Sequence, residues 1–206
     1  VVAVWTPFGV IVPAYAPAPL LVAADATNSP SFTNDGDSGR VALLEAEVLT
    51  PEVQPEGYAW VRLRWQSEAP SERNWSVFVH LVTADGVIIG QRDIYPSVGK
   101  RAMSDFAAGN GWEDRIAVWI ANAAYAPQDL TVWVGWYDLA TGARMHLPDG
   151  EERVQVGGLK LIPRSDAEGL GLPNPIRVRF EGGMTLMGYQ LSDLSPNAGD
   201  KVTLTL

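Results

Sequence analysis

The sequence predicts an all-β protein: an antiparallel β-sandwich, immunoglobulin-like or jelly-roll, followed by the first strands of a second similar domain. Two observations predict it. In most segments apolar and polar residues alternate with a period of two, which is typical of strands with one buried face. The 206 residues also include 20 Gly, 15 Pro and 8 Trp, a composition that favours short strands joined by turns.

Residues 1–24 form an apolar, Pro-rich segment without any charged side chain. Its prolines interrupt a membrane-spanning helix, and the basic start of a secretory signal is missing. We therefore expect either the exit from a membrane helix, with Val1–Trp5 as its last turns, or an apolar strand at the edge of the domain. Residues 25–40 are rich in Asn, Asp, Ser, Thr and Gly and predict a linker.

The sandwich itself is expected to span residues 41–163. Alternation predicts strands at residues 41–48, 58–65, 75–82, 87–89, 114–121, 130–138, 143–147 and 153–162. Residues 97–111 lack strand character and predict a long loop or one helical turn. The apolar faces of the strands predict a core that includes Trp65, Val79, Leu81, Val118, Val134 and Trp136.

After a linker at residues 164–175, the order of the first strands begins to repeat. Apolar residues at 184–191, a turn at 195–199 and an alternating strand at 202–206 follow the order found at 41–65, at a spacing of roughly 140 residues. Residues 176–206 therefore predict the start of a second, incomplete sandwich. We expect two antiparallel strands in residues 177–206 that complete no domain, and a chain that is a piece of a longer protein.

Charge and composition exclude several classes of function. A net charge of -9, with no cluster of Lys or Arg, argues against nucleic acid or an anionic membrane surface as a partner. The absence of Cys excludes disulfides, a thiolate nucleophile and Cys-based zinc sites. The sequence contains no His-based metal spacing, phosphate-binding loop or nucleophile motif. We therefore expect no cofactor, no metal site and no catalytic residue in this chain.

The titratable residues have structural interpretations. His80 lies in the middle of a strand, and we expect its imidazole to bind a carboxylate or carbonyl, with Asp93 as a candidate. Aspartates at strand ends usually form turns by binding their own backbone, and this applies to Asp85, Asp93, Asp114, Asp138 and Asp149. A carboxylate pair for glycoside cleavage or a calcium site is the less favoured alternative.

Three tryptophans are candidate ligand-binding residues. Trp60, Trp119 and Trp133 fall on the face of their strands opposite the main apolar stripe. An exposed row of Trp would be a stacking platform for sugar rings, so we take them as candidate glycan-stacking residues. Buried, they would instead fill a second apolar layer under loops or a partner domain, the commoner arrangement for Trp.

A series of strand and turn motifs gives the chain a resemblance to a known family. The series occurs in one order: Val77–Val82, Asp85–Gly86, Gln91–Asp93, Pro96, Gly109, Asp114, Val134–Asp138 and Thr141–Arg144. It resembles the C-terminal extracytoplasmic β-sandwich domains of bacterial polytopic membrane glycosyltransferases, of the dolichyl-phosphate-mannose protein-mannosyltransferase type. Residues 5–17 are similar to the exit from the last membrane helix of those enzymes. The chain departs from the family at residues 97–112, where Phe106 stands in place of a Trp.

The resemblance implies a non-catalytic module outside the cytoplasm, tethered to the membrane through the segment that precedes or includes Val1–Trp5. Its role would be to position or recognise glycan for a membrane glycosyltransferase-like protein. Its partners would be glycan and the adjacent domains or membrane subunits of the parent, and not nucleic acid. The alternative is a structural or protein-interaction module of a cell-surface or membrane assembly. Solvent exposure of the three tryptophans discriminates between the two hypotheses.

Overall fold

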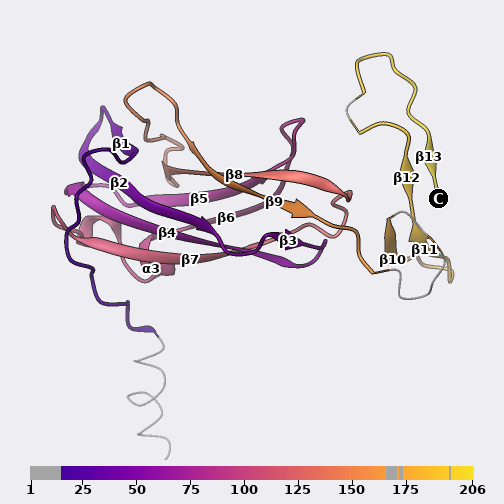
Figure 1. Cartoon of the computed structure of the whole chain (residues 1–206), viewed down its shortest axis with the longest axis horizontal. Helices are drawn as coiled ribbons and strands as arrows, with labels where there is room; N and C mark the ends of the chain where they lie inside the picture. The colour runs from indigo at the N-terminus through magenta and orange to yellow at the C-terminus, as the bar shows by residue number, and fades with distance from the viewer. Residues whose placement is uncertain (1–14, 166–170, 172–173, 195) are drawn as a thin grey trace, which may run out of the picture.

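The computed structural model describes residues 15–165, 171, 174–194 and 196–206. Its main body consists of two sheets packed face to face (Figure 1), which confirms the predicted all-β sandwich. The membrane-exit segment predicted at Val1–Trp5 lies outside the described residues. Within the part of the chain that is described, no helix is long and apolar enough to cross a membrane.

The first sheet has four antiparallel strands, and the second has five. In order across the first sheet these are β1 (Ser31–Asn34), β2 (Asp37–Val48), β4 (Tyr58–Ala69) and β7 (Gly111–Trp119). Across the second they are β3 (Glu52–Val53), β9 (Val154–Leu161), β8 (Gln128–Asp138), β5 (Trp75–Val82) and β6 (Ile88–Ile94). Only the short β3 pairs in parallel, with β9.

The core lies between the inner faces of the two sheets. All six residues predicted to be core are fully buried: Trp65, Val79, Leu81, Val118, Val134 and Trp136. The Trp65 and Trp136 rings meet edge to face across the sheets, with centroids 4.9 Å apart. Trp112 extends this aromatic cluster at 6.2 Å from Trp136, a geometry that adds to the stabilisation from buried area.

Three predictions about the strands differ from the structure. The sheet begins inside residues 25–40, where a linker was expected, because Phe32 of β1 is fully buried and Asp37 at the start of β2 accepts a hydrogen bond from the Trp75 indole. Conversely, residues 143–147 form only two isolated bridges, at Arg144 and His146. The edge strand β6 is also longer than the predicted 87–89 and runs to Ile94.

The predicted non-strand segment 97–111 contains two single turns, α3 (Pro96–Gly99) and η2 (Met103–Asp105). The prediction was a long loop or one helical turn, and the segment is a loop that contains two short turns. In α3, Ser97 and Val98 have positive φ values of 56° and 54°, a conformation that is uncommon for residues with a side chain. The turn is held by Asp114 of β7, whose carboxylate accepts a 2.7 Å hydrogen bond from the Val98 N–H.

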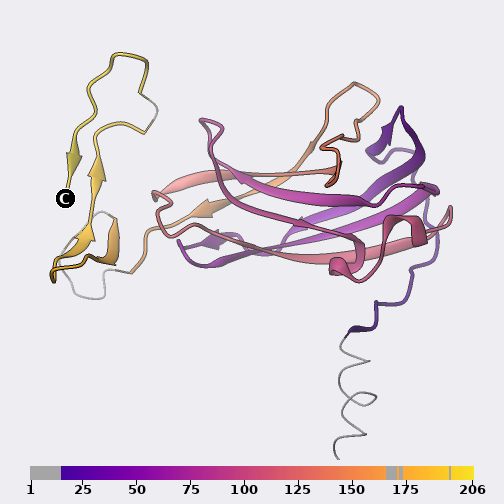
Figure 2. The ribbon, with the colours of Figure 1, turned by 180° about the vertical axis from the view of Figure 1, so that it is seen from behind.

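The C-terminal tail (residues 174–194 and 196–206) stands at one end of the sandwich, away from the end where residues 15–24 leave it (Figures 1 and 2). It contains β10 (Pro175–Arg179), β11 (Thr185–Gly188), β12 (Gln190–Leu191) and β13 (Leu204–Thr205). These pair antiparallel as β10 with β11 and β12 with β13. The tail therefore forms two small strand pairs where the sequence predicted one.

Candidate functional site

Two of the three candidate tryptophans lie together on the outer face of the first sheet. Trp60 is on β4 and Trp119 is on the neighbouring β7, where Trp119 lies opposite Tyr58 and Trp60 lies opposite Ala117. Their strand neighbours Ala59 and Val118 are fully buried, so the two indoles share the opposite, outward face. Diagonal positions of this kind are about 7–8 Å apart on an antiparallel pair.

These aromatic side chains are exposed to solvent. The exposed fractions are 45% for Trp60, 46% for Trp119 and 55% for Tyr58. We call Tyr58, Trp60 and Trp119 the aromatic platform. Tyr58 was missed by the sequence analysis, although its position two residues before Trp60 on an alternating strand places it on the same face.

Trp133 lies elsewhere, so the expected single row of three tryptophans is wrong. It belongs to β8 of the second sheet, opposite His80, and faces outward on the other side of the sandwich. The Arg153 guanidinium covers its ring, 4.4 Å from the centroid. The alternation places a side chain on the outer side of its strand but does not say to which sheet the strand belongs.

A group of ion pairs adjoins the platform along the same strands. Arg62, two residues after Trp60, contacts the carboxylates of Glu45 at 2.7 Å and Glu47 at 2.6 Å. Glu113 of β7 lies 4.0 Å from the same guanidinium. Positive and negative side chains from β2, β4 and β7 therefore border the aromatic platform. The guanidinium group can donate hydrogen bonds to a ligand, and the carboxylates can accept them.

The outer face of the second sheet is largely covered. Phe78 of β5 is buried there, with the Arg144 guanidinium 5.1 Å above its ring and the His80 ring 4.6 Å away. His80 Nε2 lies 3.8 Å from Asp93 Oδ1, so Asp93 is the carboxylate beside His80, at a separation longer than a hydrogen bond. Asp93 also accepts a hydrogen bond from the Tyr137 hydroxyl at 3.1 Å. The neighbouring His80, and after it Tyr137, lower the pKa of Asp93 below 3.8 against the effect of burial.

The other strand-end aspartates divide into two kinds. Asp138 and Asp149 form turns by binding the backbone, as predicted: Asp138 accepts from the Ala140 N–H at 2.9 Å and Asp149 from the Glu151 N–H at 3.1 Å. Asp85 also lies in a turn, but its carboxylate accepts from the Thr83 hydroxyl and not from the backbone. Asp114 is instead fully buried and accepts from the Trp112 indole at 2.9 Å as well as from Val98. Burial raises its pKa to about 6. Among the described residues, no three acidic or His side chains gather into a possible metal site.

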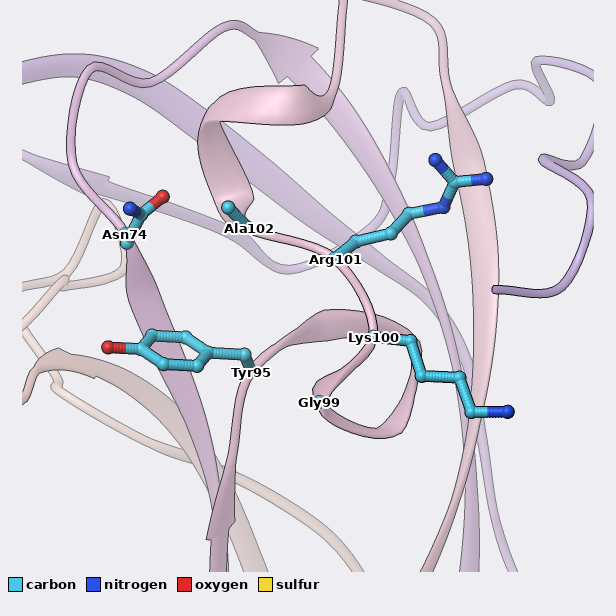
Figure 3. A pocket seen from close by; sticks show the side chains of 6 residues that line it. All are labelled: Asn74, Tyr95, Gly99, Lys100, Arg101 and Ala102. Carbon is cyan, nitrogen blue, oxygen red and sulfur yellow. The ribbon is translucent and has the colours of Figure 1, made fainter. Parts of the chain in front are cut away.

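A hollow of about 250 Å³ lies beside α3 (Figure 3). Figure 3 shows Asn74 and Tyr95 on one side, with the Lys100 and Arg101 side chains extending away from them. Lys100 donates to the Ala16 carbonyl at 3.3 Å and Arg101 to the Ala18 carbonyl at 3.3 Å. The two cations therefore fasten the N-terminal segment to the sandwich instead of converging on the hollow.

Comparison with known proteins identifies no family. No protein-family model matches the chain, and no curated protein sequence does. Among solved structures, it is similar to a β-glucuronidase from glycoside hydrolase family 2, at 12% identity and a TM-score of 0.35, over 59% of this chain and 11% of that one. It is also similar to a Niemann-Pick type C2 protein from Japanese carpenter ant, at 10% identity and a TM-score of 0.33, over 68% of this chain and 99% of that one. At these TM-scores neither similarity bears on function.

Proposed function

We propose that this chain is a non-catalytic, extracytoplasmic β-sandwich module of a membrane glycosyltransferase-like protein, and that it holds glycan on the aromatic platform. The observation that carries the proposal is the shared exposure of Tyr58, Trp60 and Trp119 on one sheet face. Large aromatic side chains are normally buried, and a contiguous exposed patch is typical of a binding surface.

The geometry of the platform favours a sugar as the ligand. A pyranose ring has a flat face of C–H groups that can stack on an aromatic ring, while its hydroxyl groups need polar partners at the rim. The sheet fixes the spacing of the aromatic side chains, so little conformational entropy is lost on binding. Arg62 and Glu113 lie beside the platform on the same two strands and supply a donor and an acceptor.

The same surroundings favour binding over catalysis. Glu45, Glu47 and Glu113 each contact the Arg62 guanidinium, an ion-pair arrangement that holds these carboxylates on the sheet surface. The platform is also an open sheet surface that does not exclude water from a ligand. A weak, tethered binder would raise the local concentration of an acceptor glycan without slowing its release.

The proposed location, outside the cytoplasm and tethered through residues 1–24, is supported by the uncharged, Pro-rich composition of that segment. Its test is topology mapping of the parent protein. A reporter fused after residue 206 should be active only outside the cytoplasm, and activity in the cytoplasm would contradict the location without bearing on glycan binding.

Titration with neutral oligosaccharides tests the binding function. We expect Trp fluorescence to be quenched with a dissociation constant of about 10⁻³ to 10⁻⁴ M, since stacking and a few hydrogen bonds must offset the lost freedom of the sugar. Trp60→Ala and Trp119→Ala should each weaken binding at least about tenfold, a loss of roughly 1.4 kcal/mol. The affinity should change little with salt, because no charged ligand is involved.

Trp133→Ala is the matched control, because it removes an indole from the opposite side of the sandwich. It should leave the affinity unchanged, while urea melts establish that all three variants are folded. Equal losses in all three variants, or no binding at millimolar sugar, would contradict the proposal. The second outcome would favour a protein-contact role, for which exposed Trp and Tyr are equally suited.

A further inference from the structure

The pairing of β12 with β13 in the C-terminal tail reproduces the pairing of β2 with β4 in the first sheet. In both places the second strand of the pair follows the first by the same number of residues and in the same register. The corresponding pairs are separated by a constant 143 positions: Val48–Val61 with Leu191–Leu204, and Glu47–Arg62 with Gln190–Thr205. A chance similarity in the order of apolar residues would not also reproduce which residues pair across the two strands. A slip of one residue in the pairing would turn the apolar side chains of one strand to its other face.

The order of the strands agrees with this correspondence. At the spacing of 143, β11 and β12 together match β2, interrupted at Tyr189, and β13 matches part of β4. β11 pairs with β10 and β12 with β13, as β2 pairs with β1 on one side and with β4 on the other. The order of the strands is therefore the same in both places, although β10 pairs with β11 in a different register from that of β1 with β2.

The apolar face of that sheet is also repeated, but in the tail it is uncovered. Ala59, Val61 and Leu63 are fully buried in the sandwich beneath the second sheet. Their counterparts are exposed to 40% at Val202, 54% at Leu204 and 78% at Leu206. Met184, the counterpart of the fully buried Val41, is 70% exposed. An isolated strand pair with one bare apolar face is at best marginally stable in water.

The uncovered face is continuous with an interface that already exists. Tyr189, the counterpart of the partly buried Ala46, packs its ring 5.8 Å from Tyr125 and donates to the Ala123 carbonyl at 2.9 Å. Beyond this contact the face opens into an apolar hollow of about 520 Å³, lined by Phe180, Met184, Leu186 and Leu206 among others. The first sandwich thus covers one edge of the face and leaves the rest free.

We infer that Met184, Val202, Leu204 and Leu206 form the inner face of a second sandwich, and that this face binds a second β-sheet. Its partner is the counterpart of the sheet containing β5 and β8, whose inner residues Val79 and Val134 are fully buried against the first sheet. In the first copy those strands follow β4 in the chain. This inference concerns the tail alone and does not depend on glycan binding at the platform.

A chain extended by its own remaining strands tests the inference. Because Leu206 corresponds to Leu63, residues 64–163 are appended directly after Leu206. We expect amides of residues 202–206 to exchange about a hundredfold more slowly than in the 206-residue chain, and fluorescence of a bound apolar dye to fall. A second extension that begins at residue 65 shifts the register by one and should give neither change.

Point variants of the extended chain separate the two faces of β13. Leu204→Asp replaces the counterpart of Val61 and should abolish the slow exchange, since it buries an unpaired charge. Thr203→Asp changes the outward counterpart of Trp60 and should leave the protection intact. The inference is overturned if exchange at residues 202–206 is unchanged by the extension, or if the two variants behave alike. It is also overturned if sedimentation shows the 206-residue chain to be a dimer with these amides already protected, because the occupant is then a second copy.

Discussion

At the scale of the residue, Asp114 shows how one buried side chain supports an uncommon backbone. Its carboxylate binds the Val98 N–H in a turn with positive φ and the Trp112 indole in the core. The sequence placed Asp114 at a strand end and predicted an ordinary Asp turn. That prediction was wrong because Asp114 sits on the inward face of β7, between the buried Trp112 and Ile116.

The raised pKa of Asp114 predicts a pH dependence of stability. Between its ordinary pKa of 3.8 and the folded value of about 6, the folded state binds more protons than the unfolded state. The stabilisation is therefore present below pH 3.8 and is lost as the pH rises through 6, by about 3 kcal/mol in all. Asp114→Asn should flatten the difference in unfolding free energy between pH 4 and 7, measured by urea melts at each pH. Parallel pH profiles for the two proteins would contradict the assignment.

The buried tryptophans predict large losses of stability on truncation. Trp136→Ala removes a fully buried ring that contacts both Trp65 and Trp112, and should cost about 3–5 kcal/mol in the free energy of unfolding. Trp60→Ala, at the surface, should cost less than about 1 kcal/mol. Urea melts measure both values. A loss below about 1 kcal/mol for Trp136→Ala would mean that this ring is not part of the core.

At the scale of the element, the alternation of apolar and polar residues predicted the central strands well and the segments at the edges of the sheets poorly. Along residues 58–65 every second side chain faces the same core. The strand is therefore recognisable in the sequence from its alternation of apolar and polar residues. β1 was missed because a polar-rich segment can pair at an edge while burying one residue, Phe32. Residues 143–147 have the alternation of a strand. They nevertheless form only one isolated bridge with β1 and one with β8, so no continuous strand results.

A hydrogen bond at the junction between the sandwich and the tail predicts that one substitution there will loosen the tail alone. Asn174 is buried, and its side-chain oxygen accepts a 3.1 Å hydrogen bond from the Ala126 N–H. Asn174→Ala would leave that buried N–H without its partner, at a local cost of about 1–3 kcal/mol. Amides of β10–β12 should exchange faster while the urea transition of the sandwich stays unchanged. Asn197→Ala, in an exposed turn of the tail, is the control and should alter neither. Equal effects of the two variants would show that Asn174 does not hold the tail.

At the scale of the whole molecule, the sequence was sufficient for the fold class and insufficient for the site. A sandwich follows from many weak, repeated signals that all agree. The site depends on which strands become neighbours: β4 and β7 are far apart in the sequence, yet their pairing brings Trp60 and Trp119 together and separates both from Trp133. Sheet membership arises from tertiary packing, and periodicity along one strand does not contain it.

The constant spacing between the sandwich and its tail has a consequence for valency. At the positions of Tyr58 and Trp60 the tail has Lys201 and Thr203, so the repeat preserves the inward apolar residues and replaces the outward aromatic ones. Multivalent gain requires at least two equivalent binding sites joined by a linker. If the platform binds glycan as proposed, a tandem pair built on this pattern would therefore bind it with the affinity of a single site. Its second sandwich would lengthen the module and contribute no avidity.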